Sequence, residues 1–110
     1  MTSSALPKPA RIDSTIGDDG VITLFVGGEI DLQTAPALEQ ALLDAERARP
    51  RRIVLDLGGV GFMDSTGIHQ LLAAHERAAA NGHTIAFRHV SGFTRRLFAL
   101  SGADALWSVA

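Results

Sequence analysis

The sequence contains no cysteine, which excludes disulfide bonds and thiolate metal sites. It also lacks a surplus of positive charge, because 10 Lys and Arg residues stand against 12 Asp and Glu residues. Binding to nucleic acid or to anionic lipid depends on such a surplus, so neither partner is expected. The apolar runs fall far short of the ~20 residues that a membrane helix needs. The first residues do not have the charged and apolar segments of a signal peptide, and we therefore expect a cytoplasmic protein.

A length of 110 residues suits a single domain. A chain of this size buries roughly two thirds of the surface that it exposes when unfolded, so its core needs no covalent cross-link. Residues 1–10 are rich in serine and proline and predict a short disordered tail. Residues 11–110 are expected to form the folded domain.

Hydrophobic periodicity alternates between strand and helix along this domain. Two β-rich segments around the turn Gly17–Gly20 predict a hairpin. A helix is expected next, with Thr34 as its cap, Pro36 in its first turn and an end near Pro50. The segment 53–57 is almost entirely apolar, as in a strand covered on both faces. The full expected order is strand 12–16, strand 21–26, helix 34–49, strand 53–57, helix 64–81, strand 84–88, helix 92–101 and strand 105–109.

This order predicts an α/β fold with a mixed sheet. Strands joined by helical crossovers are parallel, and the N-terminal hairpin adds an antiparallel portion. Apolar residues at helical spacing mark one face of the first helix and one face of the last. These residues are Leu38, Leu42 and Ala45 in the first helix, and Phe93, Leu97 and Leu100 in the last.

No convincing catalytic set is found in the sequence. Its histidines, at positions 69, 75, 83 and 89, never have the i, i+4 spacing that puts two imidazoles on one helix face. The glycines of segment 58–61 lack the lysine of a phosphate-binding loop, and we interpret them as a flexible loop. Ser65 begins a helix after a strand, as the nucleophile of a hydrolase elbow does, but Met63 stands where that turn needs glycine. The sequence therefore predicts a protein that is not an enzyme and binds no metal or cofactor.

Ser65 is better interpreted as a group that is acted upon. A serine at the start of a helix lies beside unpaired backbone N–H groups and the positive end of the helix dipole, so it can cap the helix or carry a phosphate. Phosphorylation adds about −1.5 to −2 charges, which the fold tolerates there and which a partner packed against the neutral hydroxyl does not. Thr66 offers a second hydroxyl, but its side chain is expected to point elsewhere on the first helical turn.

Five segments of the chain carry a family resemblance. The most specific is Val60–Gly67, whose Phe-Met-Asp-Ser-Thr-Gly run lies between a strand and a helix. The others are Gly28–Asp31, Thr34–Ala35, Ile53–Leu57 and Arg96–Gly102. Together they resemble the STAS family, and more closely its bacterial anti-sigma factor antagonists, over roughly residues 12–109.

The resemblance implies a mixed sheet with three to four helices packed mainly on one face. It also implies partner switching. In this family the unphosphorylated antagonist binds an anti-sigma factor that is also a GHKL-type serine kinase, which frees a sigma factor. Phosphorylation of the serine that aligns with Ser65 ends this binding, and a serine phosphatase restores it. The residues expected to contact the partner are Asp31, Asp64, Thr66, Gly67 and Ile68.

Two alternatives stay open at this point. Asp64 either sharpens the switch, by adding like charge and orienting the Ser65 hydroxyl, or simply caps the helix. The chain could also be a STAS adaptor in a signalling or lipid-transport complex, with no phosphorylation cycle. A kinase encoded beside it supports the antagonist, whereas transporter subunits encoded beside it support the adaptor.

Overall fold

The computed structural model describes residues 10–100, which form four strands and three helices. The elements are β1 (Arg11–Ile16), β2 (Val21–Ile30), α1 (Ala35–Arg47), β3 (Arg52–Met63), α2 (Ser65–Asn81), β4 (Thr84–Arg88) and α3 (Gly92–Leu100). Their order is the one predicted from the sequence. The strand expected at 105–109 lies outside the described residues. So does the expected tail, except for Ala10, which is half-buried against the core.

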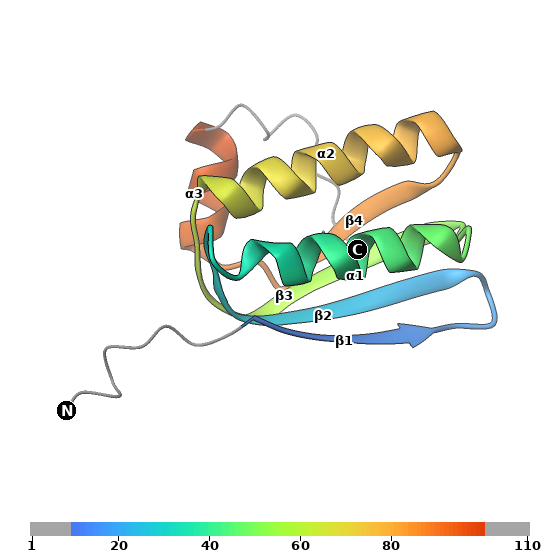
Figure 1. Ribbon diagram of the computed structural model, residues 1–110, viewed down its shortest axis with the longest axis horizontal. Helices are drawn as coiled ribbons and strands as arrows, with labels where there is room; N and C mark the ends of the chain where they lie inside the picture. The colour runs from blue at the N-terminus through green and yellow to red at the C-terminus, as the bar shows by residue number, and fades with distance from the viewer. Residues whose placement is uncertain (1–9, 101–110) are drawn as a thin grey trace.

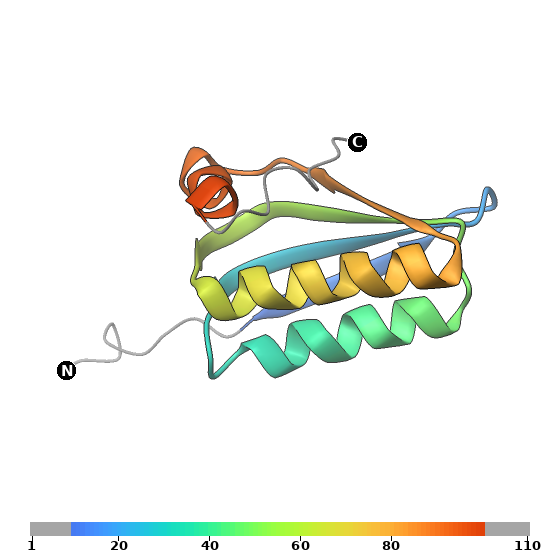
Figure 2. The same cartoon turned by 90° about the horizontal axis from the view of Figure 1, so that it is seen from above.

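The strands form one mixed sheet in the order β1-β2-β3-β4. β1 is antiparallel to β2, whereas β2, β3 and β4 run parallel to one another. Crossovers between parallel strands are right-handed as a rule, so two crossovers that advance in the same direction place their helices on the same face of the sheet. Figures 1 and 2 show α1 and α2 side by side on that face. The predicted fold class is confirmed.

The core fills the space between the sheet and these two helices. Leu38, Leu42 and Ala45 are buried on α1, as predicted, and Ile68 and Leu71 are buried on α2. Because side chains alternate along a strand, every second residue of the inner strands points into this layer. The buried strand residues of the core are Ile22, Leu24, Val26, Ile30, Ile53, Leu55, Leu57, Met63, Ile85 and Phe87.

β3 is longer than the sequence predicted, and it includes the glycine segment 58–61. The interpretation of this segment as a flexible loop was wrong. Gly59 pairs with Gly27 of β2 beside a register shift, and a Cβ on Gly59 would lie only 3.0 Å from the Cα of Gly27. The glycines therefore allow two backbones to approach closely. The added length carries β3 to Met63, beside the end of β2 at Ile30.

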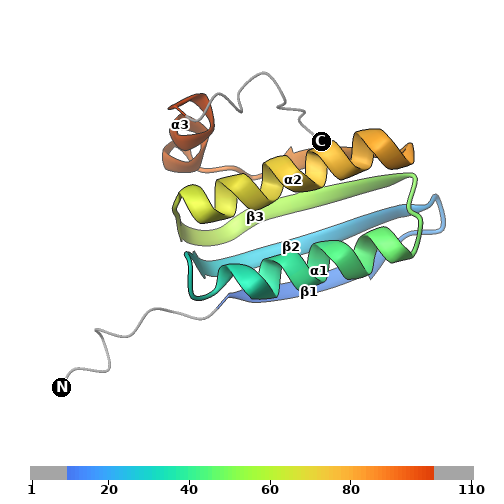
Figure 3. The same cartoon turned by 45° about the horizontal axis from the view of Figure 1, so that its top comes forward.

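α3 lies at the end of the molecule where α2 begins (Figure 3). Its buried residues are Thr94 and Phe98, which differ from the predicted face. Of the predicted set, Leu97 is half-buried, whereas Phe93 and Leu100 are 48% and 84% exposed. Phe98 joins the core cluster and packs against Phe87 of β4, so spacing along the helix alone did not identify the buried side of α3.

Candidate functional site

Two parallel strands end side by side at this end of the sheet. Ile30 of β2 pairs with Met63 of β3, and an aspartate follows each of them. The Asp64 N–H donates a hydrogen bond of 3.0 Å to the carbonyl of Ile30, which joins the two junctions. Asp31 and Ser65 therefore lie at the same end of the sheet, on neighbouring connections.

The β3–α2 junction is capped by Asp64. Its Oδ1 accepts a 2.9 Å hydrogen bond from the Thr66 N–H, and its carbonyl accepts a 3.3 Å bond from the Ile68 N–H. This is the arrangement of a helix N-cap, which satisfies N–H groups that have no partner within the helix. Within residues 10–100, the Asp64 carboxylate makes no hydrogen bond to the Ser65 hydroxyl. The geometry thus shows the capping role of Asp64.

Ser65 is the first residue of α2 and is exposed. Its hydroxyl has no hydrogen-bond partner among residues 10–100. A group at this position lies at the positive end of the helix dipole, where a negative charge is stabilised. The site therefore offers one accessible hydroxyl that can accept a phosphoryl group without breaking an existing contact in the described part of the chain.

Thr66 faces a different environment. Its half-buried side chain lines a groove of about 190 Å³ between α1 and α2, together with Glu39, Leu42 and His69. The two neighbouring hydroxyls are therefore unequal, because Thr66 lies against α1 and Ser65 lies on the surface.

Gly67 and Ile68 belong to the core. Both are buried, and a Cβ on Gly67 would lie 2.7 Å from Cγ of Met63 and 2.9 Å from Cγ2 of Ile30. This close approach seats the first turn of α2 on the ends of β2 and β3. Gly67 and Ile68 therefore position the site from within the core, and their contact with a partner stays a prediction.

At the β2–α1 junction the hydroxyl is fully engaged. Thr34 occupies the N-cap position, but its side chain makes no capping hydrogen bond, contrary to the prediction. The Thr34 hydroxyl instead donates to the carbonyl of Glu29 and accepts a 3.0 Å bond from the Asp31 N–H. The Oδ1 atom of Asp31 accepts 3.0 Å bonds from the N–H groups of Gln33 and Thr34. The loop is thereby held in one shape.

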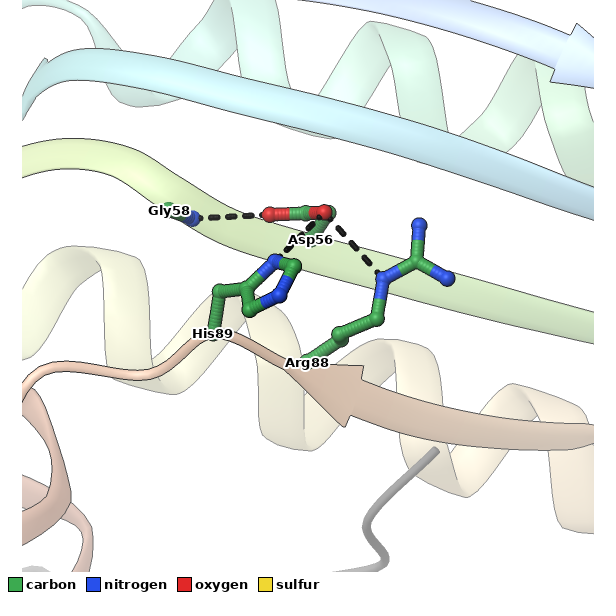
Figure 4. Close-up of polar contacts among 4 residues, drawn as sticks. All are labelled: Asp56, Gly58, Arg88 and His89. Atoms are coloured by element: carbon green, nitrogen blue, oxygen red, sulfur yellow. Dashed lines mark hydrogen bonds and ion pairs between the residues drawn. The ribbon is translucent and has the colours of Figure 1, made fainter.

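A network around Asp56 fixes the chain where it leaves the sheet for α3 (Figure 4). Its Oδ1 accepts a 2.9 Å bond from the Gly58 N–H, and its Oδ2 lies 3.2 Å from Nε of Arg88 and 3.0 Å from Nδ1 of His89. Burial alone would raise the pKa of Asp56, but the bonds from Gly58, His89 and Arg88 outweigh burial and lower it. This network was not predicted from the sequence. The signal was a carboxylate inside the apolar segment 53–57.

Within the described part of the chain, no three His, Asp or Glu side chains are grouped so that they could hold a metal ion. None of the helices between residues 10 and 100 is long and apolar enough to span a membrane. The fold and the junction define a small α/β domain whose distinctive group is the exposed Ser65 hydroxyl between β3 and α2, which has no hydrogen bond within residues 10–100.

Comparison with known families places this domain. The family model described as "Mlab, STAS domain" matches residues 15–108, and the chain belongs to the STAS domain family. The Anti-sigma-F factor antagonist RsfB of Mycobacterium tuberculosis is 39% identical over 102 residues, which cover 90% of this chain and 81% of RsfB. The Anti-sigma-B factor antagonist of Staphylococcus aureus is 32% identical over 95 residues, 86% of this chain and 88% of that protein. These relatives are named as regulators and not as enzymes.

Solved structures agree. An anti-sigma factor antagonist from Mycobacterium paratuberculosis is 35% identical and superposes with a TM-score of 0.78, covering 94% of this chain and 89% of that one. The anti-sigma factor antagonist SpoIIAA in its unphosphorylated form has a TM-score of 0.76 at 18% identity, covering 91% and 88% of the two chains. The second likeness shows the shared fold.

Proposed function

We propose that this protein is an anti-sigma factor antagonist that switches partners by phosphorylation of Ser65. In its unmodified form it binds an anti-sigma factor that is also a GHKL-type serine kinase, and so releases a sigma factor in the bacterial cytoplasm. Transfer of the γ-phosphoryl group of ATP to Oγ of Ser65 ends the binding, and a serine phosphatase removes the group. The observation that carries the proposal is the exposed Ser65 hydroxyl, unbonded within residues 10–100, at the start of α2.

The relatives support the first part of this proposal. Both curated relatives described above are named as antagonists of anti-sigma factors, and they align along nearly the whole domain. The fold of this chain is also that of SpoIIAA, which has been solved in a phosphorylated form with a TM-score of 0.71 to this chain. A phosphoryl group is therefore compatible with this architecture.

The choice of Ser65 over Thr66 rests on accessibility. A kinase must bring the γ-phosphate of ATP within bonding distance of the hydroxyl, and only Ser65 is on the open surface. Thr66 lies in the groove against α1. We assign Asp31 and Asp64 to the rim of the partner contact, because both are half-exposed on the two connections that meet beside Ser65.

The test is to locate the phosphate. The purified chain is incubated with ATP and each GHKL-type anti-sigma factor from the same genome, and modified peptides are mapped by mass spectrometry. We expect stoichiometric phosphate on Ser65, its loss in Ser65→Ala and its retention in Thr66→Val. Phosphate found only at another residue would contradict the assignment of the site. Binding that is strong and never depends on phosphate would favour the adaptor function.

A further inference from the structure

Three exposed apolar side chains belong to segments that meet at the end of the sheet where α2 begins (Figure 3). Leu32 is 78% exposed in the β2–α1 connection, directly after Asp31. Phe62 is 41% exposed near the end of β3, three residues before Ser65. Phe93 is 48% exposed at the start of α3. Exposed apolar groups that gather in one place commonly mark a contact surface.

The two aromatic rings form a pair. Met63 points into the core, so the preceding Phe62 points to the other face of the sheet. The ring centroid of Phe62 lies 6.1 Å from that of Phe93, with a tilt of 31° between the ring planes. β3 and α3 thus contribute one aromatic pair. Figures 1 and 3 show that α3 and the end of β3 lie at the end of the sheet where α2 begins.

The surface is rigidly supported. The Asp56 network fixes His89, whose φ of 58° turns the chain out of β4. Phe98 of α3 also packs edge-on against Phe87 of β4, with ring centroids 5.3 Å apart. On the other flank, the hydrogen bonds of Asp31 and Thr34 hold the loop that carries Leu32. A pre-formed surface loses little conformational entropy on binding, which is a property of docking sites.

We propose that the anti-sigma factor contact extends from Ser65 across Leu32 and the Phe62–Phe93 pair, and that apolar side chains of the anti-sigma factor cover it. This inference rests on the proposed function. Leu32 directly follows Asp31, Phe62 lies three residues before Ser65, and the bond from the Asp64 N–H to the Ile30 carbonyl joins the two connections that carry them. The inferred contact explains why phosphate ends binding. A dianion enclosed by apolar groups loses its hydration and gains no counter-charge, so the closed contact becomes unfavourable.

The test uses three matched alanine variants and the anti-sigma factor that binds the unmodified chain in the experiment above. Phe93→Ala and Phe62→Ala are each expected to weaken binding at least about tenfold, as truncation of a buried aromatic anchor does. The control is Ile16→Ala, since Ile16 is 73% exposed at the opposite end of the sheet, and it should stay within about twofold. Calorimetric titration gives the affinities, and thermal unfolding confirms that each variant is folded.

If Phe93→Ala and Phe62→Ala both bind as the unmodified chain does, the inference is overturned. Ser65→Asp measured in parallel separates the two proposals. If Ser65→Asp binds more weakly while Phe62→Ala and Phe93→Ala bind as the unmodified chain does, the proposed function stands and the inference is overturned. If Ser65→Asp, Phe62→Ala and Phe93→Ala all bind as the unmodified chain does, both proposals are contradicted.

A double variant tests the apolar explanation itself. The loss caused by Ser65→Asp should be several-fold smaller in the Phe93→Ala background, because part of the apolar enclosure is gone. Additive losses contradict this explanation. Sedimentation of the free chain tests whether a second copy of this chain covers the surface. A dimer that Phe93→Ala dissociates would assign the surface to that second copy and overturn the inference.

Discussion

The two strand-to-helix junctions share an aspartate turn and differ in how a nearby hydroxyl is used. In both, a parallel strand ends, an aspartate follows, and the aspartate Oδ1 accepts a hydrogen bond from the N–H two residues later. At the first junction the Thr34 hydroxyl bonds to the carbonyl of Glu29 and to the N–H of Asp31. At the second, the Ser65 hydroxyl has no bond within residues 10–100. The first junction thus uses its hydroxyl for structure, and the second leaves the Ser65 hydroxyl accessible.

This difference shows how a site can be recognised without a cavity. A polar group whose bonds are all made inside the fold contributes to stability, whereas one left open at a rigid helix start can change its chemistry without unfolding the domain. Thr34 and Ser65 are therefore expected to respond to substitution in opposite ways: Thr34 through folding and Ser65 through binding.

The largest expected effect is on binding at Ser65. Ser65→Asp should weaken binding to the anti-sigma factor about 100-fold, equivalent to about 2.7 kcal/mol, because the charge is desolvated in the contact. Ser65→Ala should bind as the unmodified chain does. Both affinities are measured by titration calorimetry. Equal affinity of the two variants would contradict the claim that a charge at Ser65 controls binding.

The next effect is on stability at Thr34. Thr34→Val should lower the free energy of unfolding by about 2 kcal/mol, since it leaves the Glu29 carbonyl and the Asp31 N–H without their partner. Ser65→Ala, the matched change at the other junction, should alter stability by less than about 0.5 kcal/mol. Urea unfolding checks both variants. If Thr34→Val is as stable as Ser65→Ala, the two hydroxyls do not differ as described.

A further effect is the pH dependence of stability at a third aspartate, Asp56. Asp56→Asn should cost about 1.5 kcal/mol at pH 7, because the carboxylate holds Gly58, Arg88 and His89. Its pKa is lowered in the folded state, so its stabilisation is present above the unfolded pKa of about 3.9 and is lost as pH falls through the folded pKa.

The measurement is urea unfolding of Asp56→Asn and the unmodified chain from pH 7 down to acid pH. Their difference in stability should shrink below about pH 4. The exposed Asp18→Asn serves as control, with an expected change under about 0.5 kcal/mol at pH 7. A difference that stays constant through the acid range would contradict the assigned role of Asp56.

The smallest effect is at the cap of α2. Asp64→Ala should cost about 1 kcal/mol of stability, the usual value of an N-cap, and Asp64→Asn should cost much less because its side-chain oxygen also accepts a bond. Thermal unfolding measures both. Should Asp64→Asn block phosphorylation while remaining folded, the carboxylate would have a role in phosphoryl transfer beyond capping.

Much of the fold followed from the sequence, because periodicity is strong where helices and strands bury one face. Leu38, Leu42 and Ala45 were predicted to share a face and are buried. The buried face of α1 depends on local pattern alone. Asp31 was expected beside Ser65 only through the family resemblance, and the structure places the two on neighbouring connections.

The missed features depend on contacts between distant segments. The glycines at 58–61 resemble a loop in sequence, and only the approach of Gly27 to Gly59 explains why they form a strand. The exposed pair of Phe62 and Phe93 joins β3 to α3, which spacing along one helix does not predict. Gly67 and Ile68 match a family motif, and their burial shows that a motif residue can support a site from within the core.

The most direct test of the central claim uses one chain in two chemical states. The protein is phosphorylated to completion on Ser65, and its dissociation constant for the anti-sigma factor is measured beside that of the unmodified protein at the same salt concentration. The phosphorylated form is expected to remain folded and to bind at least about 100-fold more weakly. Equal affinity of the two folded forms would contradict it.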